Sequence, residues 1–364
     1  MSTVPIQTVH TQSVPMQSVP MRADELLVET IDGILADHCT PERIGAAENS
    51  FDPNLWKILE ESGLTLVGVS ESLGGSGGSR HDAAALIKAS GYHAAPVPLA
   101  DTLLAASILA NAGIPVPSGP LALAIARPDL AYITIPYGGV ASNIVVVSSD
   151  RTAVVETSSF ADSKRTGNYA AEPALSIGQA DLANLASWAR ASEPKSDLEL
   201  VFAHAALARA GALAGALQRA LELCIQYANE REQFGKPIGK FQILQHYLSE
   251  IAGEASATSG AVDNAVDILV TSSDPNEHVA VCAAAKAYAG RAVTTVTRLA
   301  HQIHGAIGYT DEHRLQYTTR RLWSWRDEFG SESEWATVLG RSICANGGPA
   351  LWPRITSWPA PAAS

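Results

Sequence analysis

The stretch REQFGKPIGKFQ, residues 231–242, lies between two long segments with helical spacing and decides the architecture of the C-terminal half. The Ala-rich segment 197–230 precedes it, and a second helical segment runs from 241 to about 271. Gly235, Pro237 and Gly239 break the helix between them. A second string, QIHGAIG (residues 302–308), ends a third helical segment, 277–304, with glycines typical of helix C-caps. Consecutive helices joined by short turns predict an antiparallel bundle.

Before this bundle, the residue pattern of the chain changes from helical to β-like. Residues 22–113 have helical spacing, whereas 114–195 carry prolines and short β-branched runs such as NIVVV, residues 143–147. We therefore predict an α+β, mainly α fold. It has an N-terminal helical domain (22–113), a small middle β domain (114–195) and a C-terminal antiparallel four-helix bundle (196–345). Residues 1–21 and 346–364 are proline-containing and are expected to be a disordered tail and a C-terminal tail.

The composition excludes several classes of protein. With 46% hydrophobic and 17% charged residues, the chain is too apolar for a disordered protein. A net charge of -12 argues against nucleic-acid binding, which needs a basic surface. The four cysteines form no CxxC pair, so neither a zinc site nor a disulfide framework is predicted, and no metal is expected.

The sequence carries no predicted membrane span or signal peptide. The most apolar stretch, Ala203 to Ala228, is interrupted by Arg209, Arg219 and Glu222. The N-terminus lacks a basic start followed by an apolar block. We therefore expect a cytoplasmic protein.

Taken singly, each glycine-containing string has two interpretations. Arg231 at a helix junction can pair with a phosphate, aided by backbone NH groups at the next helix start, or it can be an exposed arginine in a turn. Gly305 and Gly308 can let a ligand approach closely, or they can simply cap a helix. The arginines at 320, 321 and 326 can meet a phosphate or form an ion-paired face.

Together, the strings resemble the acyl-CoA dehydrogenase family. Arg-x-x-Phe-Gly is followed about 70 residues later by Gln-x-x-Gly-Ala-x-Gly, as in that family's C-terminal bundle. The segment ESGLTLVGVSESLGGSGG, residues 61–78, looks like its first domain, and the helix, β, helix order agrees. The resemblance covers roughly residues 24–345 and is weakest in the β domain.

The resemblance implies FAD as cofactor and α,β-dehydrogenation of an acyl-CoA thioester, in which a carboxylate removes the α proton and the flavin accepts the β hydride. In this family the two strings bind the ADP half of the FAD of a neighbouring subunit. Carried over, Arg231 would meet the pyrophosphate and Phe234 the adenine end. The matching positions are Arg231, Gln233, Phe234, Gln242, Gln302, Gly305 and Ala306, where Ala306 replaces a usual glycine.

Two departures from the family pattern concern the chemistry. The β domain lacks the family's Thr-Glu-Pro-like turn and its Gly-Ser-Asp, which help to hold flavin and substrate. The family's catalytic Glu lies at one of two positions. One matches the region of Ala205, which has no carboxylate; the other matches Phe329, with Glu328 one residue early. One residue on a helix is a rotation of about 100°, so Glu328 is expected to point elsewhere.

These absences predict a partner-type subunit of a heteromeric acyl-CoA dehydrogenase, such as those acting on steroid side-chain CoA esters. A second subunit of the same family, in a heterotetramer, would then hold the flavin ring and the base, with an electron-transfer flavoprotein as electron acceptor. Two alternatives stay open: a self-sufficient homomeric enzyme with Glu328 as catalytic base, and a catalytically silent scaffold subunit.

Overall fold

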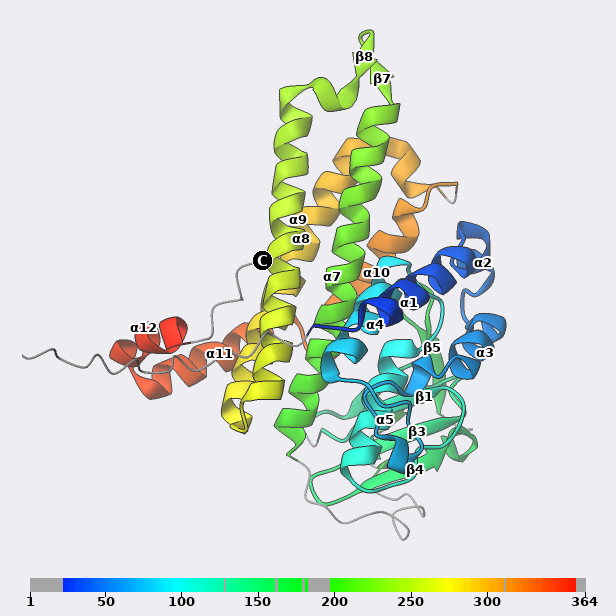
Figure 1. The fold of residues 1–364 in the computed structure, drawn as a ribbon, viewed down its shortest axis with the longest axis vertical. Coiled ribbons are helices and arrows are strands. Elements are labelled where there is room, and N and C mark those ends of the chain that lie inside the picture. The colour runs from blue at the N-terminus through cyan, green and yellow to red at the C-terminus, as the bar shows by residue number, and fades with distance from the viewer. Residues whose placement is uncertain are drawn as a thin grey trace, which may run out of the picture.

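A computed structural model of the chain describes residues 22–127, 129–160, 163–178, 181–182, 197–310 and 312–357. The expected tail at 1–21 lies outside the described residues, as do 358–364. Helices pack at the N-terminal end of the sequence, two small sheets follow, and a bundle of long helices completes the fold (Figure 1).

The N-terminal part is helical. Its helices are α1 (Glu25–His38), α2 (Pro41–Ala46), α3 (Pro53–Glu61), α4 (Arg80–Tyr92) and α5 (Leu99–Asn111). Helix α4 crosses α7 (Leu198–Glu230) with their backbones in close contact, because Gly91 and Gly215 lie at the crossing. A Cβ atom on either glycine would overlap the backbone of the other helix. The two glycines thus allow the N-terminal helices to pack closely against the bundle.

Two three-stranded sheets form the middle part. The first has the order β1 (Leu121–Ile125), β3 (Asn143–Val147), β4 (Thr152–Glu156), with β1 parallel to β3. The second has the order β2 (Tyr132–Pro136), β6 (Pro173–Gly178), β5 (Lys164–Gly167) and is antiparallel. Their apolar side chains share one core, which includes Ile135, Ile144 and Ile177. The β-branched runs at 132–135, 143–147 and 152–155, expected as strands, form β2, β3 and β4, whereas β1, β5 and β6 were not predicted; β5 is exposed throughout and has no apolar run.

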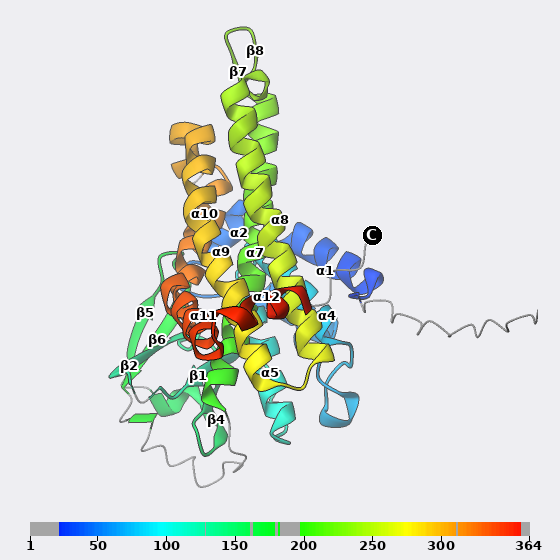
Figure 2. The ribbon, with the colours of Figure 1, turned by 90° about the vertical axis from the view of Figure 1, so that its left-hand side faces the viewer.

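The C-terminal part is a bundle built on α7, α8 (Gln242–Thr271), α9 (Pro275–His304) and α10 (Leu315–Asp327). A short hairpin, β7 (Glu232–Gln233) and β8 (Lys236–Pro237), joins α7 to α8 and extends beyond the rest of the molecule (Figure 2). Helix α11 (Glu332–Asn346) packs on α9. The region expected to be a C-terminal tail instead contains helix α12 (Gly348–Ser357).

Helix α7 is long and apolar enough to span a membrane by length and composition alone. However, 72% of its most apolar window is buried inside the fold. Its alanines pack against α4, α8 and α9, as in the core helix of a globular domain.

Candidate functional site

The turn between α10 and α11 carries Glu328, the catalytic base in one of the alternatives left open by the sequence. Helix α10 ends at Asp327, and Glu328 is extended, with φ -68° and ψ 135°. Phe329 then has φ +53° and Gly330 φ +95°. A Cβ at Gly330 would lie 2.6 Å from the indole nitrogen of Trp335, so the turn requires glycine there.

Hydrogen bonds from outside the turn hold this conformation. The fully buried Lys286 of α9 donates to the carbonyls of Arg326 (2.6 Å) and Gly330 (2.7 Å). The indole of Trp335 donates to the Phe329 carbonyl at 2.8 Å. Burial lowers the pKa of Lys286 to about 7. The turn is therefore fixed by side chains of α9 and α11.

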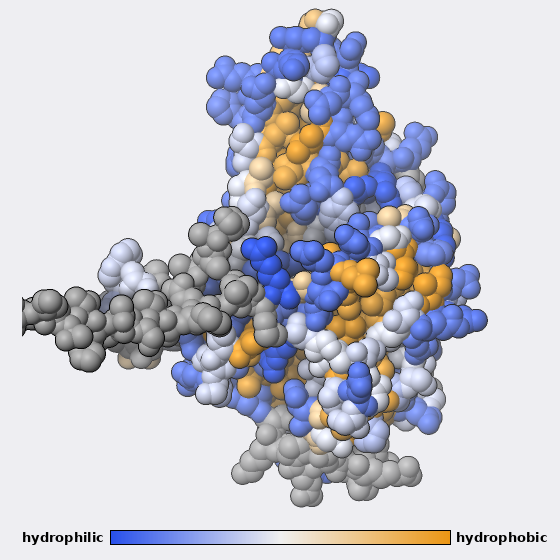
Figure 3. All heavy atoms as spheres, in the orientation of Figure 1, coloured by the Kyte–Doolittle hydropathy of each residue, from blue (hydrophilic) through white to orange (hydrophobic). Residues whose placement is uncertain are grey.

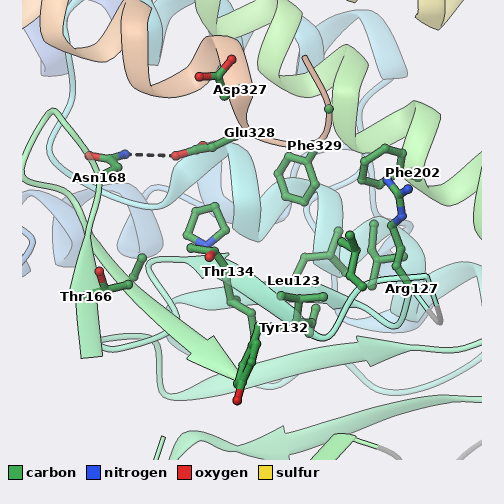
Figure 4. A pocket seen from close by; sticks show the side chains of 18 of the residues that line it. Leu123, Arg127, Tyr132, Thr134, Thr166, Asn168, Phe202, Asp327, Glu328 and Phe329 are labelled. Carbon is green, nitrogen blue, oxygen red and sulfur yellow. Dashed lines mark hydrogen bonds between the residues drawn. The ribbon is translucent and has the colours of Figure 1, made fainter. Parts of the chain in front are cut away.

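A cavity of about 490 Å³ lies between the two sheets and this turn (Figure 4). Its walls include Leu123, Tyr132, Thr134, Thr166, Phe202 and Phe329. Figure 4 shows the Phe329 ring projecting toward the cavity, whereas the Glu328 carboxylate points toward Asn168. The turn is irregular and not helical, and it brings Glu328 to the cavity wall with its oxygens directed at protein groups.

Both oxygens of Glu328 face polar groups of the protein. Arg209 of α7 forms an ion pair with it (Nε to Oε2, 2.5 Å), and the Asn168 amide donates to its Oε1 at 3.0 Å. Arg209 also donates to both oxygens of Asp101 on α5, at 2.9 and 3.1 Å. Burial raises the pKa of Glu328 to about 7, although the Arg209 charge opposes this. Burial likewise raises the pKa of Asp101.

The same polar cluster extends into the β domain through Glu172. Glu172 accepts from the indole of Trp325 (2.9 Å) and the amide of Asn168 (2.8 Å), and it forms an ion pair with Arg321 (3.0 Å). We call the cluster of Asp101, Arg209, Glu328, Asn168, Glu172 and Arg321 the three-part network. It joins α5, the segment between β5 and β6, and the bundle at one buried point.

The sequence prediction missed the three-part network, although a signal for it exists. Arg209 and Asp101 are charged residues within mainly apolar stretches of their helices. A charge at such a position is almost always paired when buried. Ala205, at the alternative base position, is fully buried one helical turn before Arg209.

The predicted cofactor residues on the hairpin are exposed. Phe234 at its tip has φ +52° and is 91% exposed, with Phe241 in edge contact. Arg231, Gln233 and Gln242 are also exposed, and Arg231 forms no ion pair within the described part of the chain. The hairpin therefore presents a guanidinium and an aromatic ring outward.

The second string lies at the same end of the bundle. His304, the last residue of α9, stacks on Tyr227 in the last turns of α7, with ring centroids 4.5 Å apart. Gly305 caps α9 with φ +64° and ψ -143°. Gln302, Gly305 and Ala306 are exposed. The structure thus brings the two strings, 71 residues apart, to one end of the molecule.

The arginine cluster of α10 is paired within the chain. Arg320 pairs with Glu48, Arg321 with Glu172, and Arg326 with Glu332. Of the two interpretations of this arginine cluster, the ion pairs agree with an ion-paired face. Among the described residues, no group of three or more His, Cys, Asp or Glu side chains could hold a metal.

Comparison with known proteins agrees with this architecture. Residues 22–115 match the family model "Acyl-CoA dehydrogenase, N-terminal domain", and residues 198–332 match "Acyl-CoA dehydrogenase, C-terminal domain". The chain is 30% identical to "Acyl-CoA dehydrogenase IpdE2" of Mycolicibacterium smegmatis over 307 residues, covering 82% of this chain and 91% of the relative.

Solved structures share the fold. One is the ChsE4-ChsE5 complex from Mycobacterium tuberculosis, with a TM-score of 0.78 at 21% identity, covering 92% of this chain and 100% of that one. Another is the steroid ACAD Tcur3481-Tcur3483, with a TM-score of 0.74 at 24% identity, covering 88% of this chain and 97% of that one.

Proposed function

Because this chain belongs to the acyl-CoA dehydrogenase family, we propose that it is one subunit of a heteromeric, FAD-dependent acyl-CoA dehydrogenase. In this proposal it completes the cofactor site of a companion subunit and does not supply the catalytic base. The observation that carries the proposal is the ion pair between Glu328 and Arg209. It holds the only carboxylate proposed as a base in this chain in contact with a guanidinium and so away from a substrate.

The exposed end of the bundle fits the ADP half of FAD. A pyrophosphate needs a cation, and Arg231 is exposed without an ion pair in the described structure. An adenine ring needs an apolar face, and Phe234 is exposed on a hairpin held away from its own chain. Leaving such a ring in water is unfavourable, so contact with another molecule is expected. Gln302 and the exposed backbone at Gly305 add polar groups at the same end.

An apolar surface beside the hairpin supports assembly with a second subunit. Figure 3 shows hydrophobic residues gathering along α7 and α8 in the upper half of the molecule. Ile225 and Ile243 are about half exposed there, at 42% and 52%. The structural relative ChsE4-ChsE5 is a complex. We therefore propose a companion from the same family, arranged with this chain as a heterotetramer.

The chemistry assigned to the pair is α,β-dehydrogenation of an acyl-CoA thioester. When bound, FAD would supply the hydride acceptor. A general base must approach the α carbon with a free carboxylate oxygen. Glu328 does not meet this requirement, because Arg209 and Asn168 engage its two oxygens. The base therefore belongs to the companion, and an electron-transfer flavoprotein is the proposed acceptor of the electrons.

One observation favours a second candidate, a self-sufficient homomeric enzyme. Glu328 lines the cavity and its pKa is raised to about 7, a value suited to a general base at neutral pH. In this case Arg209 would have to release the carboxylate when the substrate binds. The proposal and this candidate differ in where the flavin resides.

The test measures flavin per chain by absorbance for this chain alone and for the co-purified pair. The proposal expects little flavin alone and about one per pair, with Arg231→Ala lowering flavin retention in the pair. Arg291→Ala is the matched control, since the Arg291 side chain is 63% exposed on α9, where it contacts Glu254 and the ring of Tyr288. One flavin per chain alone would establish the homomeric enzyme. Unchanged flavin in Arg231→Ala would indicate a silent scaffold.

A further inference from the structure

A second cavity, of about 300 Å³, lies between α4, α5, α7 and α8. It shares no lining residue with the cavity beside Glu328. Helix α7 separates the two: Phe202 faces the first and His204 the second. The buried pair of Asp101 and Arg209 bridges α5 and α7 through the core. The second cavity is therefore a separate site, and it does not depend on the proposed function.

Small residues on facing helices create this cavity. Ala83 and Ala84 of α4 face Ala208 and Gly211 of α7. Larger residues complete an apolar wall: Val67, Ile87, Leu103, Leu104, Leu207, Val262, Val266 and Leu269. A volume of 300 Å³ is at the lower limit of small-molecule sites. Since an apolar cavity of about 150 Å³ takes a six-carbon ring, this one has room for roughly ten to twelve carbons.

Polar groups gather on one part of the lining. Arg80, the first residue of α4, is exposed and forms no ion pair within the described part of the chain. Ser107 and Asn111 line the cavity from the last turns of α5. The Nε2 atom of His204 is buried and has no hydrogen-bond partner. Such an atom is costly to bury unless a ligand or water satisfies it.

The charges around the cavity favour an anion. Burial and the nearby Arg80 charge lower the pKa of His204 to about 4, so the imidazole is neutral at pH 7. Two carboxylates of α8 near the cavity have partners on α4: Asp263 pairs with Lys88, and Asp267 contacts the imidazole of His81. Arg80 is thus the charged side chain on the lining for which the described part of the chain offers no ion-pair partner.

We propose that this cavity binds an apolar monocarboxylate of about ten carbons, with its carboxylate on Arg80 and its apolar body between α4, α5, α7 and α8. The contacts are apolar along most of the lining and polar at Arg80, Ser107 and Asn111. That distribution matches an amphiphile with one anionic end.

Calorimetric titration of the full chain with sodium decanoate tests the proposal. Ala84→Leu places additional carbons in the cavity and should weaken binding about tenfold or more, because the apolar body of the ligand loses buried contact area. Ala257→Leu, at an exposed position of α8, is the control and should bind as the wild type does. Ser107→Leu fills the cavity from α5 and serves as an independent second variant.

The anionic end is tested separately. Arg80→Gln should weaken decanoate about fivefold, as an exposed charge pair is worth up to ~1 kcal/mol, and should leave decanol unaffected. Lys57→Gln removes the same charge from an exposed position on α3 and should have no effect. Decanoate affinity that survives both filling variants would overturn the site, and equal losses in Arg80→Gln and Lys57→Gln would overturn the assigned contact.

Discussion

Replacing Arg209 by Met removes the cation on which two buried carboxylates depend. The side chain of Arg209 is 4% exposed, that of Asp101 2% and that of Glu328 15%. Methionine keeps an unbranched apolar chain of similar length, so little cavity is created. Asp101 then loses its ion pair, and Glu328 keeps only the Asn168 amide. Breaking a buried ion pair in this way costs about 3–5 kcal/mol.

The cost should depend on pH in a defined direction. Burial holds the folded-state pKa of both carboxyls above the unfolded values, with Glu328 at about 7. Each therefore stabilises the folded chain most below its unfolded pKa, and this contribution is lost as the pH rises through the folded pKa. Without Arg209 both folded pKa values rise further. The loss of stability is thus expected to be larger at about pH 8 than at about pH 5.

Urea unfolding of the isolated chain, followed by circular dichroism at both pH values, measures this difference. Arg291→Met is the control: its ion pair with Glu254 spans 3.7 Å and Arg291 is 63% exposed, so it should cost less than about 1 kcal/mol at either pH. A cost for Arg209→Met no larger than that of the control, or one that does not change with pH, would refute the role assigned to the three-part network.

Three further predictions address the site. Glu328→Gln should leave kcat of the assembled enzyme within about twofold, whereas loss of a catalytic base costs about 10²–10⁴. Phe234→Ala should change the stability of the isolated chain by less than about 0.5 kcal/mol, because the ring is 91% exposed, and yet reduce flavin retention in the pair; equal retention contradicts the adenine contact. Lys286→Met should cost about 1–3 kcal/mol by urea unfolding. Burial lowers the pKa of Lys286 from 10.5 to about 7, so between these two pH values the unfolded chain binds more protons than the folded one. The free energy of unfolding of the wild type should therefore rise with pH across this range, and that of the variant should lack this rise.

Much of the fold follows from local sequence patterns. The long helices α7, α8 and α9 are apolar segments without internal proline after their first turn, and Asp52-Pro53 and Asp274-Pro275 mark the beginnings of α3 and α9. Elements without such patterns were missed. Helix α12 contains an internal proline, Pro353, and strand β5 is exposed at all four residues. Their conformations depend on the surrounding chain more than on local spacing.

The candidate site was predicted only in part, because some of its residues lie close together in the sequence and others meet only in the folded chain. Exposed residues near a turn, such as Arg231 and Phe234, can be recognised from a short string. Apart from Asn168 and Glu172, which are four residues apart, the contacting pairs of the three-part network are separated by 108 to 160 positions along the chain, so no local spacing connects them. Helical geometry predicted that Glu328 would point elsewhere, but the residue lies beyond the helix end, in a turn fixed by Lys286 and Trp335.

The three-part network explains how the carboxylate of Glu328 can lie at a cavity wall and still be held by other protein groups. If all its ionisable groups were charged, three carboxylates (Asp101, Glu172, Glu328) would face two guanidiniums (Arg209, Arg321). A buried excess of one negative charge is unfavourable, and a proton on Glu328 relieves it, in accord with the raised pKa of that residue. The raised pKa of Glu328 thus follows first from its burial and then from the neighbouring carboxylates of the three-part network. It would resemble that of a catalytic base even if Glu328 never contacted a substrate, and for this reason the contacts of the carboxylate carry more weight than its pKa.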